Sequence, residues 1–183
     1  MVLFGGLETE GDGQFIITVD STSTGDITIQ NIEMGEWNGG FIRSDGGKSI
    51  TLKESIIAGG GSIIHNADGI LDIQSDEFIG DGINVPIESF IVIMKGYINI
   101  YNSLFKKGSF KEDRSGCIIC CGTVTSCTID GCKFIENKFN VGSAAVLIST
   151  PTCTQLTIKG NSSQRTNFSG LNVTNQLAVV ILQ

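Results

Sequence analysis

A short apolar pattern that recurs along the chain constrains its fold more than any other feature. Each copy consists of an apolar residue, any residue, a second apolar residue, four further residues and then a large apolar residue. The first apolar residues of the six copies are 23, 21, 27, 29 and 29 residues apart, and they are Ile27, Ile50, Leu71, Ile98, Cys127 and Leu156. In the sixth copy the large residue, Phe168, comes five positions late. Repeats of this length are typical of solenoids, in which each coil buries its apolar face against the next.

The pattern also predicts which side chains face inward. Successive side chains alternate across a strand, so the two apolar residues of each copy point inward and the residue between them points outward. The outward residue is polar in every copy: Thr28, Thr51, Asp72, Asn99, Thr128 and Thr157. The first apolar residues should form one inward column. The large residues should form a second column at the corner after the strand: Met34, Ile57, Phe78, Phe105 and Phe134.

A second apolar run lies between consecutive copies, after a segment rich in Gly or Ser. These runs are 41–42, 63–64, 90–93, 117–119, 145–148 and 178–181. Such short strands, with 24 Gly and only 2 Pro in the chain, favour an all-β fold. We predict a single-stranded, right-handed parallel β-helix of about six coils, in one domain over residues 1–183. A leucine-rich repeat is disfavoured because the chain is poor in Leu, and a β-sandwich would not keep one strand-to-corner offset in consecutive copies.

The pattern is incomplete at both ends. Phe4 and Phe15 are spaced as Phe134 and Ala145 are, so residues 15–19 should form the second strand of a coil whose first strand is missing. The chain also stops just after a second strand, so we expect a solenoid that is cut mid-coil at both ends. Two interpretations remain open: a segment of a longer solenoid, or a short protein whose uncapped coils associate end to end.

The charge and hydropathy of the chain argue against two kinds of partner. A net charge of −7 disfavours nucleic acid, which requires a basic surface. No apolar run reaches the roughly 18 residues of a membrane-spanning helix, so the chain is predicted not to span a membrane. No signal peptide is visible after Met1.

The six cysteines all lie in the second half of the chain and allow more than one state. They are Cys117, Cys120, Cys121, Cys127, Cys132 and Cys153. A chain of 183 residues can build a core without disulfides, which favours buried, reduced thiols, but one or two bridges remain an alternative. Cys117 and Cys120 have CxxC spacing, yet no second such pair and no His pair follows, so no metal site is predicted.

Two segments carry a family resemblance. The Gly39-Gly40-Phe41-Ile42 segment resembles the GGAI repeat of polymorphic outer-membrane proteins. The Phe134-Ile135-Glu136-Asn137 segment, followed by Ala144-Ala145-Val146-Leu147, resembles their FxxN repeat and the GGAI-type segment after it. The broader likeness covers nearly the whole chain and is to the pectate-lyase-like β-helix superfamily. Ile57 and Phe105 depart from the motif, since neither has an Asn three residues later. The resemblance implies surface display and adhesion.

The residues expected on the outward strand face favour binding over catalysis. A glycosidase needs two carboxyl groups that face each other, and Asp72 has only Thr51 and Asn99 beside it in the neighbouring copies. His65, the single histidine of the chain, is interpreted as an ordinary turn residue. We therefore predict that the chain is not an enzyme, has no catalytic residues and binds no cofactor.

Four residues are candidates for binding a partner. Tyr97 and Tyr101 flank Asn99 on one predicted strand, and exposed aromatic rings beside an amide can stack on sugar rings, although rings at such positions also serve simply to shield a sheet. Trp37 is a second aromatic candidate of the same kind. Three N-glycosylation sequons, at Asn161, Asn167 and Asn172, suggest secretion.

Taken as a whole, the sequence predicts a non-catalytic recognition or adhesion-type module, secreted or on a cell surface, with a protein or glycan partner. Only the segments after the corner residue vary in length, and insertions on one face of a solenoid usually mark its binding surface. Two alternatives remain open. One is a degenerate or weakly active polysaccharide-processing domain, and the other is an intracellular structural spacer, for which reduced cysteines in a cytoplasmic location would be suitable.

Overall fold

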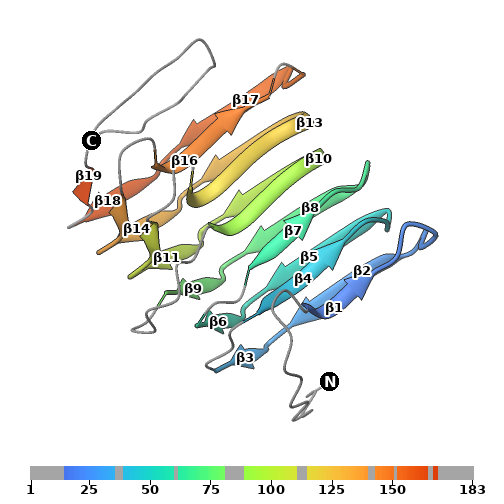
Figure 1. Ribbon diagram of the computed structural model, residues 1–183, viewed down its shortest axis with the longest axis horizontal. Coiled ribbons are helices and arrows are strands. Elements are labelled where there is room, and N and C mark those ends of the chain that lie inside the picture. Colours follow the sequence, from blue (N-terminus) through green and yellow to red (C-terminus); the bar gives the residue numbers. More distant parts are fainter. Residues whose placement is uncertain are drawn as a thin grey trace.

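A computed structural model describes residues 15–35, 39–59, 62–80, 89–110, 115–139, 143–150, 152–164 and 167–168. All regular structure in these ranges is β-strand, and no helix in them is long and apolar enough to cross a membrane. Figure 1 shows the chain winding as a solenoid whose coils stack in sequence order from the N-terminal to the C-terminal part. The solenoid has about 5 turns, close to the number predicted. The pairings between the described strands are all parallel, which confirms the parallel β-solenoid.

Each coil contributes a strand to several stacked rows. The first strands, which carry the repeated apolar pattern, are β2 (Asp26–Gln30), β5 (Ser49–Lys53), β8 (Ile70–Gln74), the second part of β10 (Ser89–Tyr101), the second part of β13 (Gly116–Asp130) and β17 (Gln155–Lys159). The corner strands are β3 (Glu33–Met34), β6 (Ile56–Ala58), β9 (Glu77–Ile79), β11 (Leu104–Lys106), β14 (Lys133–Ile135) and β18 (Ser162–Gln164). A short third row holds β12 (Ser109–Phe110), β15 (Lys138–Phe139) and β19 (Asn167–Phe168). The second strands are β1 (Phe15–Val19), β4 (Gly40–Ser44), β7 (Ile63–His65), the first parts of β10 and β13, and β16 (Ala144–Ser149).

The predicted inward columns are present. The register aligns Ile27, Ile50, Leu71, Ile98, Cys127 and Leu156 in one column, and Ile29, Leu52, Ile73, Ile100, Ile129 and Ile158 in the next. From Leu52 to Ile129 the second column has no solvent-exposed surface. The second-strand runs also align, from Ile42 through Val146. The run at 178–181 lies outside the described residues.

The corner column is completed by stacked aromatic rings. The ring centroids of Phe78 and Phe105 are 5.0 Å apart, and those of Phe105 and Phe134 are 5.2 Å apart, with nearly parallel planes. A second stack joins Phe110 to Phe139 at 5.1 Å. Stacking of this kind is a favoured aromatic geometry, and these buried rings fill the interior at the corners of successive coils.

The bend between each first strand and its corner strand has one conformation throughout. The bend residue has a positive φ in every coil, and the six residues are Asn31, Glu54, Ser75, Asn102, Gly131 and Gly160. The amides of the first five each donate to a carbonyl of the following coil; the bond from Asn31 N to Lys53 O, for example, is 3.2 Å long. Gly and Asn adopt this left-handed conformation most readily, which explains four of the six residues.

A ladder of buried side chains follows this bend, and the sequence did not predict it. Its members are Ser55, Asp76, Ser103, Cys132 and Asn161, all buried. The side chains of most members accept a hydrogen bond from the backbone N–H of the equivalent residue one coil earlier. Ser55 N donates to Asp76 Oδ1 at 2.7 Å, and Cys132 N donates to Asn161 Oδ1 at 2.7 Å. The ladder thus supplies acceptors for buried amides that the bend removes from the strand pairing.

The side chain of Asn137, the Asn of the FxxN segment, bonds to buried backbone groups after the next corner in the same way as the ladder side chains. Its Oδ1 accepts from Gly108 N at 2.8 Å, its Nδ2 donates to Phe105 O at 2.9 Å, and it has no exposed surface. We expect Asn137→Ala to lower the free energy of unfolding by about 2–4 kcal/mol, because two buried backbone groups lose their partner. Urea denaturation measures the change. The adjacent exposed residue offers the control: Lys138→Ala should stay within about 0.5 kcal/mol of wild type. Equal effects of the two substitutions would contradict the role given to Asn137.

Candidate functional site

Three of the predicted binding residues lie in one outward row on β10. Tyr97, Asn99 and Tyr101 alternate with Ile98 and Ile100, which are fully buried. Tyr97 is 44% exposed, whereas Asn99 and Tyr101 are half-buried. The alternation of side chains across the strand therefore places all three on the outer surface, as predicted.

The strands on either side of β10 complete a small patch around this row. On β8, Ile70 lies beside Tyr97, Asp72 beside Asn99 and Gln74 beside Tyr101. Asn99 Nδ2 donates to Asp72 Oδ1 at 2.7 Å. We call Ile70, Asp72, Gln74, Tyr97, Asn99 and Tyr101 the β10 patch. It combines two aromatic rings, an exposed aliphatic side chain and a hydrogen-bonded amide–carboxylate pair on one sheet.

On the other side of β10, the β13 strand adds mostly small polar side chains. Ser126, Thr128 and Asp130 lie beside Tyr97, Asn99 and Tyr101 respectively. The Asp130 carboxylate is 3.3 Å from Lys159 Nζ on the next strand, so its charge is paired. The surface around the β10 patch can therefore offer several hydroxyl, amide and carboxylate groups to a polar ligand.

The other predicted binding and glycosylation residues are not part of this patch. Trp37 and Asn172 lie outside the described residues, and Asn167 is described only as backbone in β19. Asn161 is 8% exposed, and its Nδ2, the atom that would carry a glycan, donates to Ile129 O at 3.0 Å. In the folded chain this nitrogen is therefore already used by the ladder.

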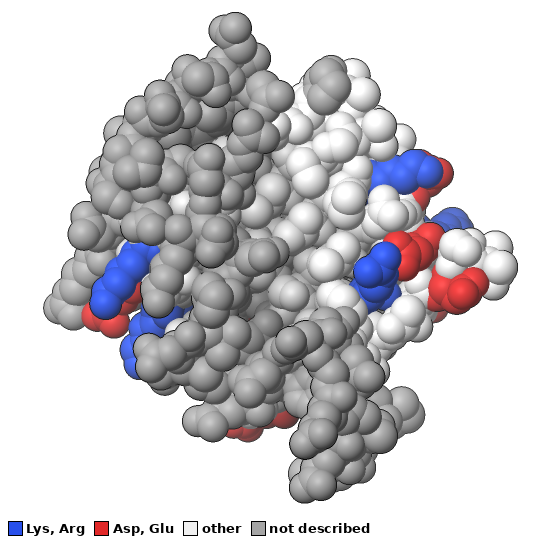
Figure 2. Space-filling view, in the orientation of Figure 1, with Lys and Arg blue, Asp and Glu red and all other residues white. Residues whose placement is uncertain are grey.

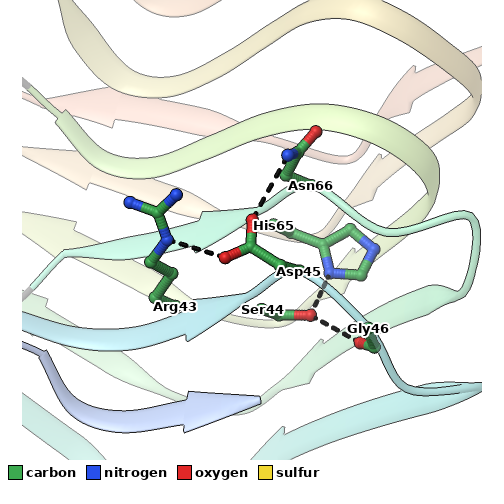
Figure 3. A network of polar contacts seen from close by, with 6 residues as sticks. All are labelled: Arg43, Ser44, Asp45, Gly46, His65 and Asn66. Atoms are coloured by element: carbon green, nitrogen blue, oxygen red, sulfur yellow. Dashed lines mark hydrogen bonds and ion pairs between the residues drawn. The ribbon is translucent and has the colours of Figure 1, made fainter. Parts of the chain in front are cut away.

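The interpretation of His65 as a turn residue is wrong. His65 is the last residue of β7, points inward and is 1% exposed (Figure 3). Its Nδ1 is 3.2 Å from Ser44 Oγ, and its Nε2 is 3.4 Å from Gly69 O. The Ser44 hydroxyl donates to Gly46 O at 2.9 Å. Burial lowers the pKa of His65, which favours the neutral imidazole at neutral pH. Ser44 and His65 are thus both buried in the interior, where an external substrate cannot reach them.

Charged side chains gather at the turns beside this histidine. Arg43 Nε donates to Asp45 Oδ2 at 2.8 Å, and Asn66 Nδ2 donates to Asp45 Oδ1 at 3.2 Å (Figure 3). The hydrogen bond from Arg43 lowers the pKa of Asp45. On the face shown in Figure 2, charged groups of opposite sign adjoin along the right-hand edge, with further charged groups at the lower left, and the described surface inward of the right-hand group is uncharged.

The second strands carry an outward apolar column that the sequence interpretation missed. Ile64, Val92, Ile119 and Leu147 lie in register and are half-buried, and Met94 nearby on β10 is 42% exposed. The signal was present in the sequence, because the runs at 90–93 and 145–148 are apolar without interruption. Such runs are typical of strands with apolar side chains on both faces.

All six cysteines are free thiols, so the interpretation with one or two bridges is not the state observed. Cys117, Cys120, Cys127 and Cys132 are buried, and Cys121 and Cys153 are partly exposed. Burial raises the pKa of Cys132 to about 11, which keeps this thiol protonated. Among the described residues, no group of three or more His, Cys, Asp or Glu side chains is arranged to hold a metal ion.

Comparison of the chain with protein-family models, with curated proteins and with solved structures gives no match. The likeness to polymorphic outer-membrane proteins and to the pectate-lyase-like superfamily therefore stays a prediction. What the structure establishes is the parallel β-solenoid itself.

Proposed function

We propose that the chain is a non-catalytic recognition module that binds a glycan on the β10 patch. The observation that carries the proposal is the outward row of Tyr97, Asn99 and Tyr101. In this row the Asn99 side-chain amide, which is hydrogen-bonded to Asp72, lies between the two tyrosines along the strand. Aromatic rings can stack on the apolar faces of sugars, and the amide and carboxylate can hydrogen-bond to hydroxyl groups. Such a module would act outside the cell or at its surface.

The dimensions and charge of the patch favour a neutral oligosaccharide. Four residues along a strand separate Tyr97 from Tyr101 by about 13 Å, which suits several linked sugars better than one. The Asp72 carboxylate at the centre and the net charge of −7 both repel an acidic polymer. A sheet surface of hydroxyl, amide and aromatic groups presents no such barrier to an uncharged chain of sugars.

The arrangement of the titratable groups supports binding without catalysis. In the middle column of the first strands, Asp72 lies between Thr51 and Asn99, so it faces no second carboxylate there. The carboxylate of Asp130 is paired with Lys159, and the single histidine is buried in the core. Glycoside hydrolysis requires two carboxyl groups on opposite sides of the scissile bond.

A glycan array of neutral, amino and acidic oligosaccharides tests the proposal, followed by titration calorimetry with the best ligand. We expect Tyr97→Ala and Tyr101→Ala each to weaken binding by about tenfold or more, which corresponds to about 1.4 kcal/mol. Thr157→Ala is the matched control, because Thr157 is an outward, exposed residue in the same column as Asn99 but two strands away. It should leave the affinity unchanged.

Two results would contradict the proposal. Unchanged affinity in both tyrosine variants would move the binding site away from the β10 patch. Release of new reducing ends from the bound oligosaccharide would show an enzyme instead of a recognition module. Urea denaturation of each variant separates a loss of binding from a loss of folding.

A further inference from the structure

Two buried thiols face each other across the corner between a second and a first strand. Cys120 and Cys127 both belong to β13, which bends between them at Gly122, and both are fully buried. Gly122 has a φ of 70°, and a Cβ there would lie 2.4 Å from Met94 O, so only glycine fits this bend. The bend brings Cys120 Sγ to 3.5 Å from Cys127 Sγ.

The two sulfur atoms occupy positions that the adjacent coils on either side fill with aliphatic side chains. Cys120 lies in register between Ile93 and Ile148. Cys127 lies between Ile98 and Leu156 in the neighbouring column. This coil therefore places two oxidisable groups at a point where its neighbours on both sides have only hydrocarbon.

We propose that Cys120 and Cys127 are a redox pair that closes to a reversible disulfide by exchange with a small-molecule disulfide such as glutathione disulfide. A disulfide requires a sulfur–sulfur distance of about 2.05 Å, so the two sulfur atoms must approach by about 1.5 Å. Rotation of the two side chains can supply a movement of this size, because both already point toward the same space.

Cys153 is the thiol through which the oxidant reaches this buried pair. It is partly exposed, and its sulfur lies against the backbone amide of Cys127 and donates to Gln155 O at 3.3 Å. The Cys153 thiolate attacks the small disulfide, which forms a mixed disulfide and releases one small thiol. The Cys127 thiolate then attacks the Cys153 sulfur and releases the second small thiol.

In the last step the Cys120 thiolate attacks the Cys127 sulfur and returns Cys153 to the thiol. In sum, the two protein thiols lose two electrons and two protons, and the small disulfide gains both as two small thiols. Cys117 and Cys132 remain reduced. Cys117 is buried at the opposite end of the first part of β13, and the Cys132 sulfur lies against backbone groups of Ile100, Ser103 and Asp130.

The test equilibrates the folded, full-length chain with mixtures of glutathione and glutathione disulfide, blocks the remaining thiols by alkylation and counts them by intact mass. We expect two fewer alkylated thiols in the oxidising mixtures, with no glutathione retained. Cys120→Ala should stop the reaction at the intermediate bond between Cys127 and Cys153, and Cys127→Ala should form no bond between protein thiols and should retain glutathione on Cys153. Cys117→Ala, which removes a buried thiol from the same strand, should lose two thiols as the wild type does. Cys153→Ala should slow the reaction at least severalfold without changing its end point.

Peptide mapping of the oxidised wild type keeps the test independent of the folding of the variants. A bond between Cys120 and Cys127 supports the proposal. A full thiol count in oxidising buffer, a bond that joins another pair, or glutathione retained on Cys121 or Cys153 would overturn it. An unchanged rate in Cys153→Ala would remove the entry route.

Discussion

Phe105→Ala is expected to lower the free energy of unfolding by about 3–5 kcal/mol. Phe105 has no exposed surface and lies at the centre of the corner stack, with the rings of Phe78 and Phe134 on either side at 5.0 and 5.2 Å. The substitution removes the transfer free energy of the ring and leaves a cavity between two coils that cannot close without shifting their strands. Urea denaturation followed by circular dichroism measures the loss.

Two further variants show whether the stack itself is responsible. Phe105→Leu fills part of the space and should cost clearly less than Phe105→Ala. Tyr97→Ala removes an aromatic ring that is 44% exposed on the outer surface, and should cost much less, because little of that ring is packed. If Phe105→Ala and Tyr97→Ala destabilised the chain equally, the corner column would not be the main packing element of the interior.

Asp76 is expected to make the chain less stable as the pH rises from about 4 to about 7. Burial, with a smaller contribution from the Glu54 carboxylate, raises the pKa of Asp76 to about 7, although Ser55 N and Gln74 N donate to the carboxylate and oppose this shift. Between the unfolded pKa of 3.8 and the native pKa, the native chain binds more protons than the unfolded chain, so the free energy of unfolding falls as the pH increases. The total effect is at most about 4 kcal/mol.

Asp76→Asn should remove this dependence and leave the chain more stable than wild type at pH 8. The ladder already shows how an amide fits, because Asn161 accepts from Cys132 N and donates to Ile129 O. His65 acts in the opposite direction: burial lowers its pKa, so its contribution to stability is lost as the pH falls below the unfolded value of 6.5. Both proteins contain His65, so its contribution cancels when the free energy of unfolding of Asp76→Asn is subtracted from that of the wild type at each pH.

Chemical denaturation at a series of pH values measures how the free energy of unfolding changes with pH in the wild type and in Asp76→Asn. Asp72→Asn is the matched control, since it alters a carboxylate on the outer face and should keep the slope of the wild type. A wild-type slope that persists in Asp76→Asn would show that another group titrates in this range.

The inward columns and the outward row could be predicted because they follow from a spacing that repeats. Ile98, Asn99 and Ile100 alternate as neighbours in a strand must, and one register then fixes their partners in the coils on both sides. The same logic placed Tyr97 and Tyr101 on the surface. None of these predictions required knowledge of how the coil turns.

The ladder could not be predicted because its members share a position and not a residue type. Ser103, Asp76 and Asn161 each present an acceptor to an amide one coil away, yet in the sequence they are three unrelated polar residues near a turn. His65 was misassigned for a related reason. A polar residue beside Asn66 suggests a turn, and only the register with Ile93 shows that it belongs to an inward column.

The bend with one conformation in every coil also bears on how such a chain can change in length over evolution. Its amides bond only to the following coil, and the segment from one bend residue to the next, such as Ser75 to Asn102, carries a complete set of interior side chains. When one such unit is gained or lost, the coils that become adjacent pack through equivalent surfaces, because each coil contacts only its immediate neighbours. Unequal recombination between units could therefore lengthen or shorten the chain without a new interior having to arise.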